Sequence, residues 1–138
     1  MADRVIFSDL ELFLTGFIRG ELVARGEAGV YVDNKFPDPA RPKTVVVRDD
    51  GGPSTSTVTE APTIGITVLA GDDPTQGAEA HRLAQLVKAI IKGSARVEPG
   101  NPIAAVLASN GPIKVPEESG QPRRYMTFEL SVTGNPFT

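Results

Sequence analysis

Two segments of the chain carry the apolar spacing of amphipathic helices. After Ser8, apolar side chains recur at intervals of three and four residues, and charged side chains fill the positions between them. Ser8 and Glu11 have the spacing of a capping box, so we expect the first helix to begin at Ser8. The apolar positions that we expect to face the core are Leu10, Phe13, Leu14, Phe17 and Ile18.

The second helical pattern follows Asp73. Asp73 precedes Pro74, and Gln76 follows two residues later, which is a strong signal for the start of a helix. Gly93 is placed to end the helix. The apolar stripe of this helix, which we expect to pack on a sheet, consists of Leu83, Leu86, Val87, Ile90 and Ile91.

Six further segments have the patterns of strands. A short β-type run, "VYVDN", precedes a β-branched run at 44–48, and residues 63–71 and 125–133 alternate apolar and polar side chains. Residues 103–108 and 112–116 are predicted as two short strands separated by a tight turn at Asn110-Gly111.

The order of these elements predicts the fold class. Strands this closely spaced are expected to pair antiparallel, because a parallel crossover needs a dozen or more intervening residues. We therefore expect a single α+β domain over residues 1–138, with a mainly antiparallel sheet and both helices on one of its faces. The loops or arms at 34–43, 51–62 and 116–122 are long for so small a domain and carry no catalytic chemistry, which favours contact with another protein.

Composition excludes several classes of function. A formal net charge of −3 and a pI near 5.1 argue against a protein that grips nucleic acid through its phosphates. The absence of cysteine excludes disulfides, thiolate metal sites and thiol nucleophiles. The N-terminal segment lacks the pattern of a signal peptide, and no apolar run is long enough to span a bilayer. We expect a soluble protein made in the cytoplasm.

Few residues are candidates for chemistry. Asp49 and Asp50 are adjacent, so on a strand they point to opposite faces and can share a metal only at a bulge. We interpret them as polar residues at a strand end or as subunit contacts. His81, the only histidine, lies on the polar side of the second helix and has no second histidine for a metal pair. Arg123 and Arg124 can meet an acidic neighbour or form a solvated strand entrance.

Three segments together resemble a known family. They are "RVIFSDLELFLTGFIRGEL" at residues 4–22, "VYVDNKFP" and "TVVVRDDGG", and they resemble the tail terminator proteins of long-tailed (siphovirus) bacteriophages, in particular the actinobacteriophage type. The resemblance implies a virion structural protein that forms a hexameric ring on the head-proximal end of the tail tube. Such a ring stops tube polymerisation and presents a surface for head–tail joining.

The resemblance also implies which partners the protein has and which kinds of ligand it lacks. The expected partners are further copies of the chain, the tail tube protein and the head–tail connector protein. The ring would enclose the DNA path without sequence-specific binding, contact no membrane, and have no enzyme activity, metal or cofactor. The residues that we expect at the subunit or tube interface are Arg48, Asp49, Asp50, Ser54, Thr55, Arg123 and Arg124.

Two alternatives remain open from the sequence. One is another ring protein of the phage neck, such as a head-completion or stopper protein, which shares the size and the assembly logic of a terminator. The other is a small enzyme that uses Asp49 or Asp50 with a metal ion.

Overall fold

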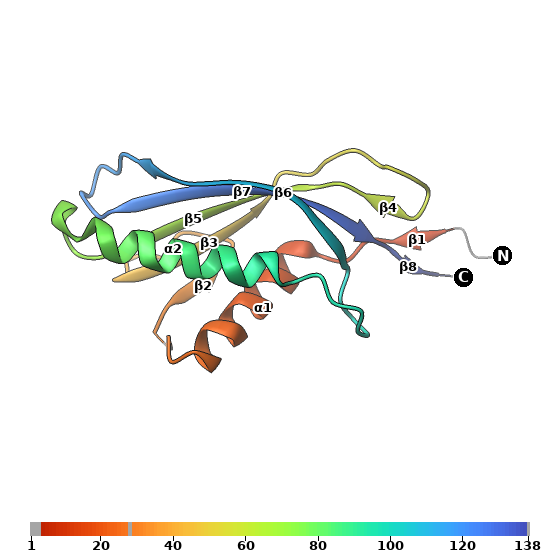
Figure 1. Ribbon diagram of the computed structural model, residues 1–138, viewed down its shortest axis with the longest axis horizontal. Coiled ribbons are helices and arrows are strands. Elements are labelled where there is room, and N and C mark those ends of the chain that lie inside the picture. Colours follow the sequence, from red (N-terminus) through yellow and green to blue (C-terminus); the bar gives the residue numbers. More distant parts are fainter. Residues whose placement is uncertain (1–3, 28, 138) are drawn as a thin grey trace.

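One mixed sheet with both helices on the same face forms the body of the molecule (Figure 1). The computed structural model describes residues 4–27 and 29–137. The strand order is β2-β3-β5-β7-β4, and β6 pairs with β7 on the other edge of that strand. This arrangement confirms the predicted α+β class. The elements of this body are α1 (Leu10–Ala24), β2 (Tyr31–Asp33), β3 (Lys43–Asp49), β4 (Thr59–Glu60), β5 (Thr63–Ala70), α2 (Gly77–Lys92), β6 (Ile103–Val115) and β7 (Arg123–Thr133).

Helix α1 begins one residue later than the capping-box pattern predicts. Asp9 is the N-cap, and its carboxylate Oδ1 accepts a hydrogen bond of 3.1 Å from the backbone N–H of Leu12. Glu11 does not fold back on the helix start, because its carboxylate accepts the backbone N–H of Asp49 at 2.8 Å and the side-chain amide of Asn34 at 3.0 Å. The prediction of Ser8 as the cap is therefore wrong, and Glu11 instead joins α1 to the end of β3.

The helical segment that contains α2 starts at Pro74 with Asp73 as its cap, as the sequence predicts. The carboxylate of Asp73 accepts the backbone N–H of Thr75 at 2.8 Å, and the first turn, Pro74–Gln76, is a 3-10 helix (η1) that leads into α2. Gly93 caps the end, as predicted. Leu86 is partly buried, and the other four predicted apolar positions are buried against the sheet.

Strict alternation along β3, β5 and β7 gives the sheet two different faces. β5 pairs antiparallel with both neighbours, with Val47 opposite Ile66 and Ile66 opposite Met126. These residues face the helices and belong to the core. The side chains at the core of the sheet on this helix-covered face are Val45, Val47, Ile64, Ile66, Val68, Met126, Phe128, Leu130 and Val132.

Two predictions about strand pairing are wrong. β2 pairs parallel with β3, although only the nine-residue loop 34–42 joins them. β2 has just three residues, so the chain has to travel back over only a short length to align with β3. Residues 103–115 form one continuous strand, β6, with no turn at Asn110-Gly111. Shifts in the register between β6 and β7 accommodate the residues of β6 that have no partner on β7. A side chain at Gly111 would come within 2.6 Å of the Tyr125 backbone oxygen.

The predicted arm at 51–62 is a hairpin rather than a free extended segment. Ser54 bridges to Glu60 within the hairpin, and β4 pairs antiparallel with the end of β7. Because β5 pairs with the preceding part of the same edge of β7, the hairpin continues that edge beyond β5. In Figure 1 it stands at the end of the molecule where β4 is labelled.

A two-stranded ribbon, absent from the sequence predictions, joins the two ends of the described chain. β1 (Val5–Ile6) pairs antiparallel with β8 (Asn135–Pro136). A side chain at Gly134 would lie 2.4 Å from Val5 Cγ2, so only glycine permits this close approach. The ribbon lies beside the hairpin end of the molecule in Figure 1.

Candidate assembly surface

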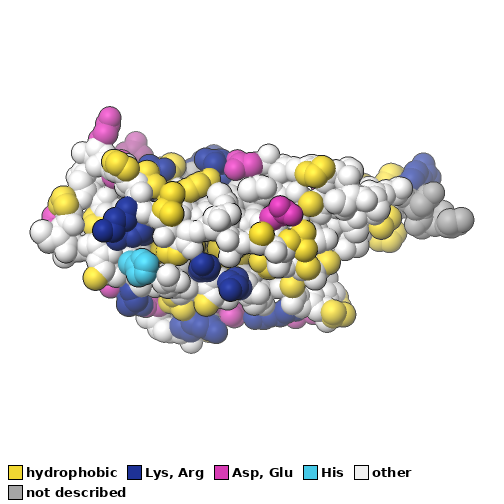
Figure 2. All heavy atoms as spheres, turned by 45° about the horizontal axis from the view of Figure 1, so that its top comes forward, with side chains coloured by type: hydrophobic (Ala, Val, Ile, Leu, Met, Phe, Trp, Pro, Cys, Tyr) yellow, Lys and Arg dark blue, Asp and Glu magenta, His cyan; other side chains and the backbone are white. Residues whose placement is uncertain are grey.

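The face of the sheet opposite the helices, here called the outer face, carries several of the predicted interface residues. Val46 on β3 pairs with Thr67 on β5, which pairs with Tyr125 on β7, and all three side chains point away from the helices. Val46 and Thr67 are nevertheless buried. Figure 2, turned so that the top of Figure 1 comes forward, shows apolar side chains interspersed with basic and acidic ones.

Arg48 lies across the outer face and holds two partners at once. Its guanidinium donates to the Asp50 carboxylate at 2.6 and 3.1 Å and to the Tyr125 hydroxyl at 2.9 Å. The guanidinium carbon lies 5.9 Å from the centre of the Tyr125 ring. Gly65 leaves room for this arrangement, because a side chain there would come within 2.5 Å of the Tyr125 hydroxyl oxygen.

The Arg48–Asp50 pair forms within one chain. The hydrogen bonds between the two side chains lower the pKa of the Asp50 carboxyl and raise the pKa of the Arg48 guanidinium. Asp49 points elsewhere, and its carboxylate accepts the backbone N–H of Gly51 at 2.8 Å. The two acids thus point in different directions, as alternation predicts. Pairing of Arg48, Asp49 or Asp50 with charges of a neighbouring subunit stays a prediction.

Two further arginines stack on aromatic rings of the same face. The Arg123 guanidinium lies 5.6 Å from the centre of the Phe36 ring and donates to the Glu117 carboxylate at 3.2 Å. Arg41, in the loop after β2, lies 5.3 Å from the ring centre of Tyr31. Arginine and aromatic residues are enriched where proteins bind one another. The outer face therefore has the composition of a contact surface.

Arg124, also predicted at the interface, is buried and does not reach the outer face. Only 7% of the residue is exposed. It follows Arg123 on β7, so alternation turns it toward the helices, and its guanidinium donates to the backbone oxygens of Gly77 and Arg123, each at 3.1 Å. Arg124 thus ties β7 to the first turn of α2.

Ser54 and Thr55 lie on the exposed hairpin. The hydroxyl of Thr55 is 2.7 Å from that of Thr59, and Ser56 makes a second hydroxyl contact of 2.7 Å with Thr59. These short bonds hold the tip in a defined shape. His81 is exposed on α2, with its ring Nε2 3.4 Å from the Gln85 amide nitrogen.

Over residues 4–27 and 29–137, no group of three or more histidine, cysteine or acidic residues is placed to hold a metal ion. Within the same residues, no helix is both long enough and apolar enough to cross a membrane.

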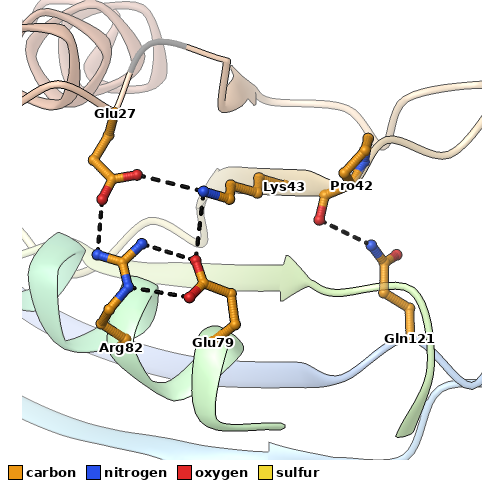
Figure 3. Close-up of polar contacts among 6 residues, drawn as sticks. All are labelled: Glu27, Pro42, Lys43, Glu79, Arg82 and Gln121. Carbon is orange, nitrogen blue, oxygen red and sulfur yellow. Dashed lines mark hydrogen bonds and ion pairs between the residues drawn. The ribbon is translucent and has the colours of Figure 1, made fainter. Parts of the chain in front are cut away.

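A network of four charged side chains joins the loop after α1 to β3 and α2 (Figure 3). Arg82 donates to Glu27 at 2.7 Å and to Glu79 at 2.8 and 3.2 Å, and Lys43 lies 3.6 Å from Glu27 and 3.4 Å from Glu79. The hydrogen bonds from Arg82 are the largest cause of the lowered pKa of both glutamates. Glu79 and Arg82 are a local pair three residues apart, but no local signal predicts that Glu27 and Lys43 join them, because these two residues are distant along the chain.

The network predicts a pH-dependent contribution to stability. Because both glutamates have lowered pKa values in the folded state, their stabilisation is fully present above about pH 4.5, near the unfolded pKa of glutamate, and is lost as the pH falls through the folded values. Arg82→Gln should lower the free energy of unfolding by about 1 kcal/mol at pH 7, as expected for partly exposed pairs, and by much less at pH 3. Urea unfolding at the two pH values measures this difference.

The matched control is Arg25→Gln. Arg25 makes a single exposed pair with Glu21 at 3.3 Å, so its removal should change stability little at either pH. An equal loss for Arg82→Gln at pH 7 and pH 3 would contradict an ionic role for the network.

Comparison with known proteins identifies no relative: no protein-family model matches the chain, and no curated protein matches it.

Proposed function

We propose that this protein is a phage structural subunit that assembles into a ring at the head-proximal end of the tail tube, ends tube growth and joins the tail to the head. The proposal rests on the resemblance of residues 4–22 and of the "TVVVRDDGG" segment to tail terminator proteins. It gives the virion as the site of action, with further copies of the chain, the tube protein and the connector as partners.

The observation that carries the proposal is the outer face of the sheet. Three arginine–aromatic pairs, at Arg48, Arg123 and Arg41, lie on a face that neither helix covers. A ring needs a head-to-tail contact between two different surfaces of each subunit. In this proposal the outer face is one of the two surfaces that contact each other. The hairpin 51–62, at the end of the sheet, contacts a neighbouring subunit or the tube.

The decisive experiment is electron microscopy of lysates from a phage that carries this gene, with and without the gene disrupted. Overlong or headless tails in the disrupted lysate are the expected result, because tube growth would lack its stop. Tails of normal length with defects only at the head would contradict tube capping and would favour a stopper or head-completion protein of the neck.

Charge reversal at Arg48 tests the contact surface itself. Arg48→Glu places two acids beside each other on the outer face, and we expect at least about tenfold weaker ring assembly with an unchanged monomer fold, since the side chain is 60% exposed. Analytical ultracentrifugation and tail capping in complementation measure the two effects. Lys92→Glu, an equal reversal on an exposed helix position, is the control and should assemble normally.

The double variant Arg48→Asp with Asp50→Arg separates two explanations. It restores a pair within the chain but exchanges the two charges on the surface. If ring assembly returns in this variant, the pair acts only inside the subunit, and the assignment of Arg48 to the subunit contact is wrong. Continued failure of assembly with a normal melting temperature supports the contact.

A further inference from the structure

The end of the sheet beside the first turn of α2 has an open cleft with three basic residues in its wall. The cleft has a volume of about 510 Å³. Lys114 comes from the end of β6, Arg123 and Arg124 come from the start of β7, and Gly77 opens α2. Glu117 is the one acidic residue of the described chain that lines it.

Arg124 is a buried charge without an acidic partner in the part of the chain that the structure describes. With 7% of the residue exposed, its guanidinium bonds only to two backbone oxygens, those of Gly77 and Arg123. Carbonyl groups satisfy donors but carry no full negative charge. Because burying a charge is costly unless it is paired, an anion beside Arg124 would be stabilising.

Two further features place positive potential at the same point. Lys114 is the cross-strand partner of Arg124, and like charges directly opposite one another on a sheet repel. The guanidinium of Arg124 also lies at the first turn of α2, which is the positive end of that helix. Among the ion pairs of residues 4–27 and 29–137, none includes Lys114 or Arg124.

Three acids near the cleft are already engaged by other groups. Glu117 accepts from Arg123, Asp73 accepts the backbone N–H and the hydroxyl of Thr75, and Glu79 pairs with Arg82 and Lys43. The Nε of Arg123 is itself buried without a hydrogen-bond partner. These three acids therefore do not compensate the charges of Lys114 and Arg124.

We propose that this cleft binds an anionic oxygen group of the carboxylate or phosphate type, with Lys114 and Arg124 supplying the charge. The inference is independent of the ring proposal, because Lys114 and Arg124 are not among the arginine–aromatic pairs of the outer face. A free oxyanion and an acidic side chain of a bound protein present the same chemistry to these residues.

The first test is titration of the purified protein with inorganic phosphate at constant ionic strength. We expect amide shifts in NMR spectra around residues 74–77 and 114–124 and a melting temperature that rises with phosphate concentration, because a ligand of the folded state stabilises it. Lys114→Gln should weaken binding at least about tenfold, the amount expected when one charge of a bound pair is lost. Lys114 is exposed, so the variant should keep its fold.

Lys92→Gln, which removes an exposed lysine from the opposite end of α2, is the matched control and should leave the affinity unchanged. A hexaglutamate peptide forms the second arm of the experiment and tests a protein carboxylate as the source. Binding of either probe that depends on Lys114 supports the site. No binding of either probe, or an equal loss in both lysine variants, overturns it.

Discussion

Phe128→Ala is expected to lower the free energy of unfolding by about 3–5 kcal/mol, the usual cost of removing a buried phenyl ring. Phe128 lies at the middle of β7 and is 0% exposed, within the core that both helices share with the sheet. Its neighbours on β5 and α2 are fixed by the strand register and by the helix cap, so the structure can close the cavity only in part. Urea unfolding monitored by circular dichroism measures the loss.

Phe36→Ala makes the same chemical change where the ring is 52% exposed. It removes the stacking of Arg123 and some buried area, and we expect a loss below about 1 kcal/mol. Similar losses for the two variants would contradict the placement of Phe128 in the core. If the outer face is the subunit contact, Phe36→Ala should also weaken ring assembly although the monomer stays stable.

Gly52→Ala is expected to displace the hairpin 51–62 without unfolding the domain. A Cβ atom at Gly52 would lie 2.0 Å from the backbone oxygen of Ala61, a contact that no side-chain motion can relieve. The two arms of the hairpin must therefore separate, at a cost of about 1–3 kcal/mol, typical of overpacking. Faster hydrogen exchange and proteolysis at residues 51–62, with unchanged exchange in β5, are the expected results.

Gly16→Ala provides the control for this change. Its Cβ atom meets nothing within 4 Å, and alanine favours a helix over glycine by about 1 kcal/mol, so the variant should be slightly more stable. Hairpin amides that keep their protection in Gly52→Ala would show that the close approach to Ala61 does not constrain the hairpin.

The helices and the central strands could be predicted from the sequence because their signals are local. The apolar spacing in α2 and the alternation at Met126 and Phe128 each record burial on one side of one element. The capping-box pattern predicts the N-terminus of α1 at Ser8 because it takes no account of distant contacts of Glu11. Glu11 binds the backbone of Asp49, and nothing near Glu11 in the sequence announces that contact.

Strand pairing is harder to predict because it depends on which segments, distant along the chain, come to lie side by side. The sequence Asn110-Gly111 is a common turn signal. Here β6 pairs with β7 along its whole length, and this continuous pairing replaces the expected turn. The parallel pair of β2 and β3 escapes the usual length rule because β2 is only three residues long. Both errors arise from contacts between segments, which local patterns do not encode.

Some of the predicted interface residues lie on the outer face, and one is buried. Arg48, Asp50 and Arg123 reach the outer face, whereas Arg124 is buried. The alternation that places Met126 inward, extended back by two residues, also places Arg124 inward, so a signal for its burial was present. No local pattern marks Tyr125 as a member of this surface, because its contact with Arg48 joins residues 77 positions apart.

The ribbon that joins β1 to β8 has a consequence for the order of folding. The pairing of Val5 with Pro136 closes a loop of nearly the whole chain, and the entropic cost of closure grows with loop length. Only two residues of each strand take part, and Ile6 is 59% exposed, so little burial offsets that cost. The ribbon should therefore close after the core has formed and open before it, which makes the two ends of the domain a separate unit of local unfolding.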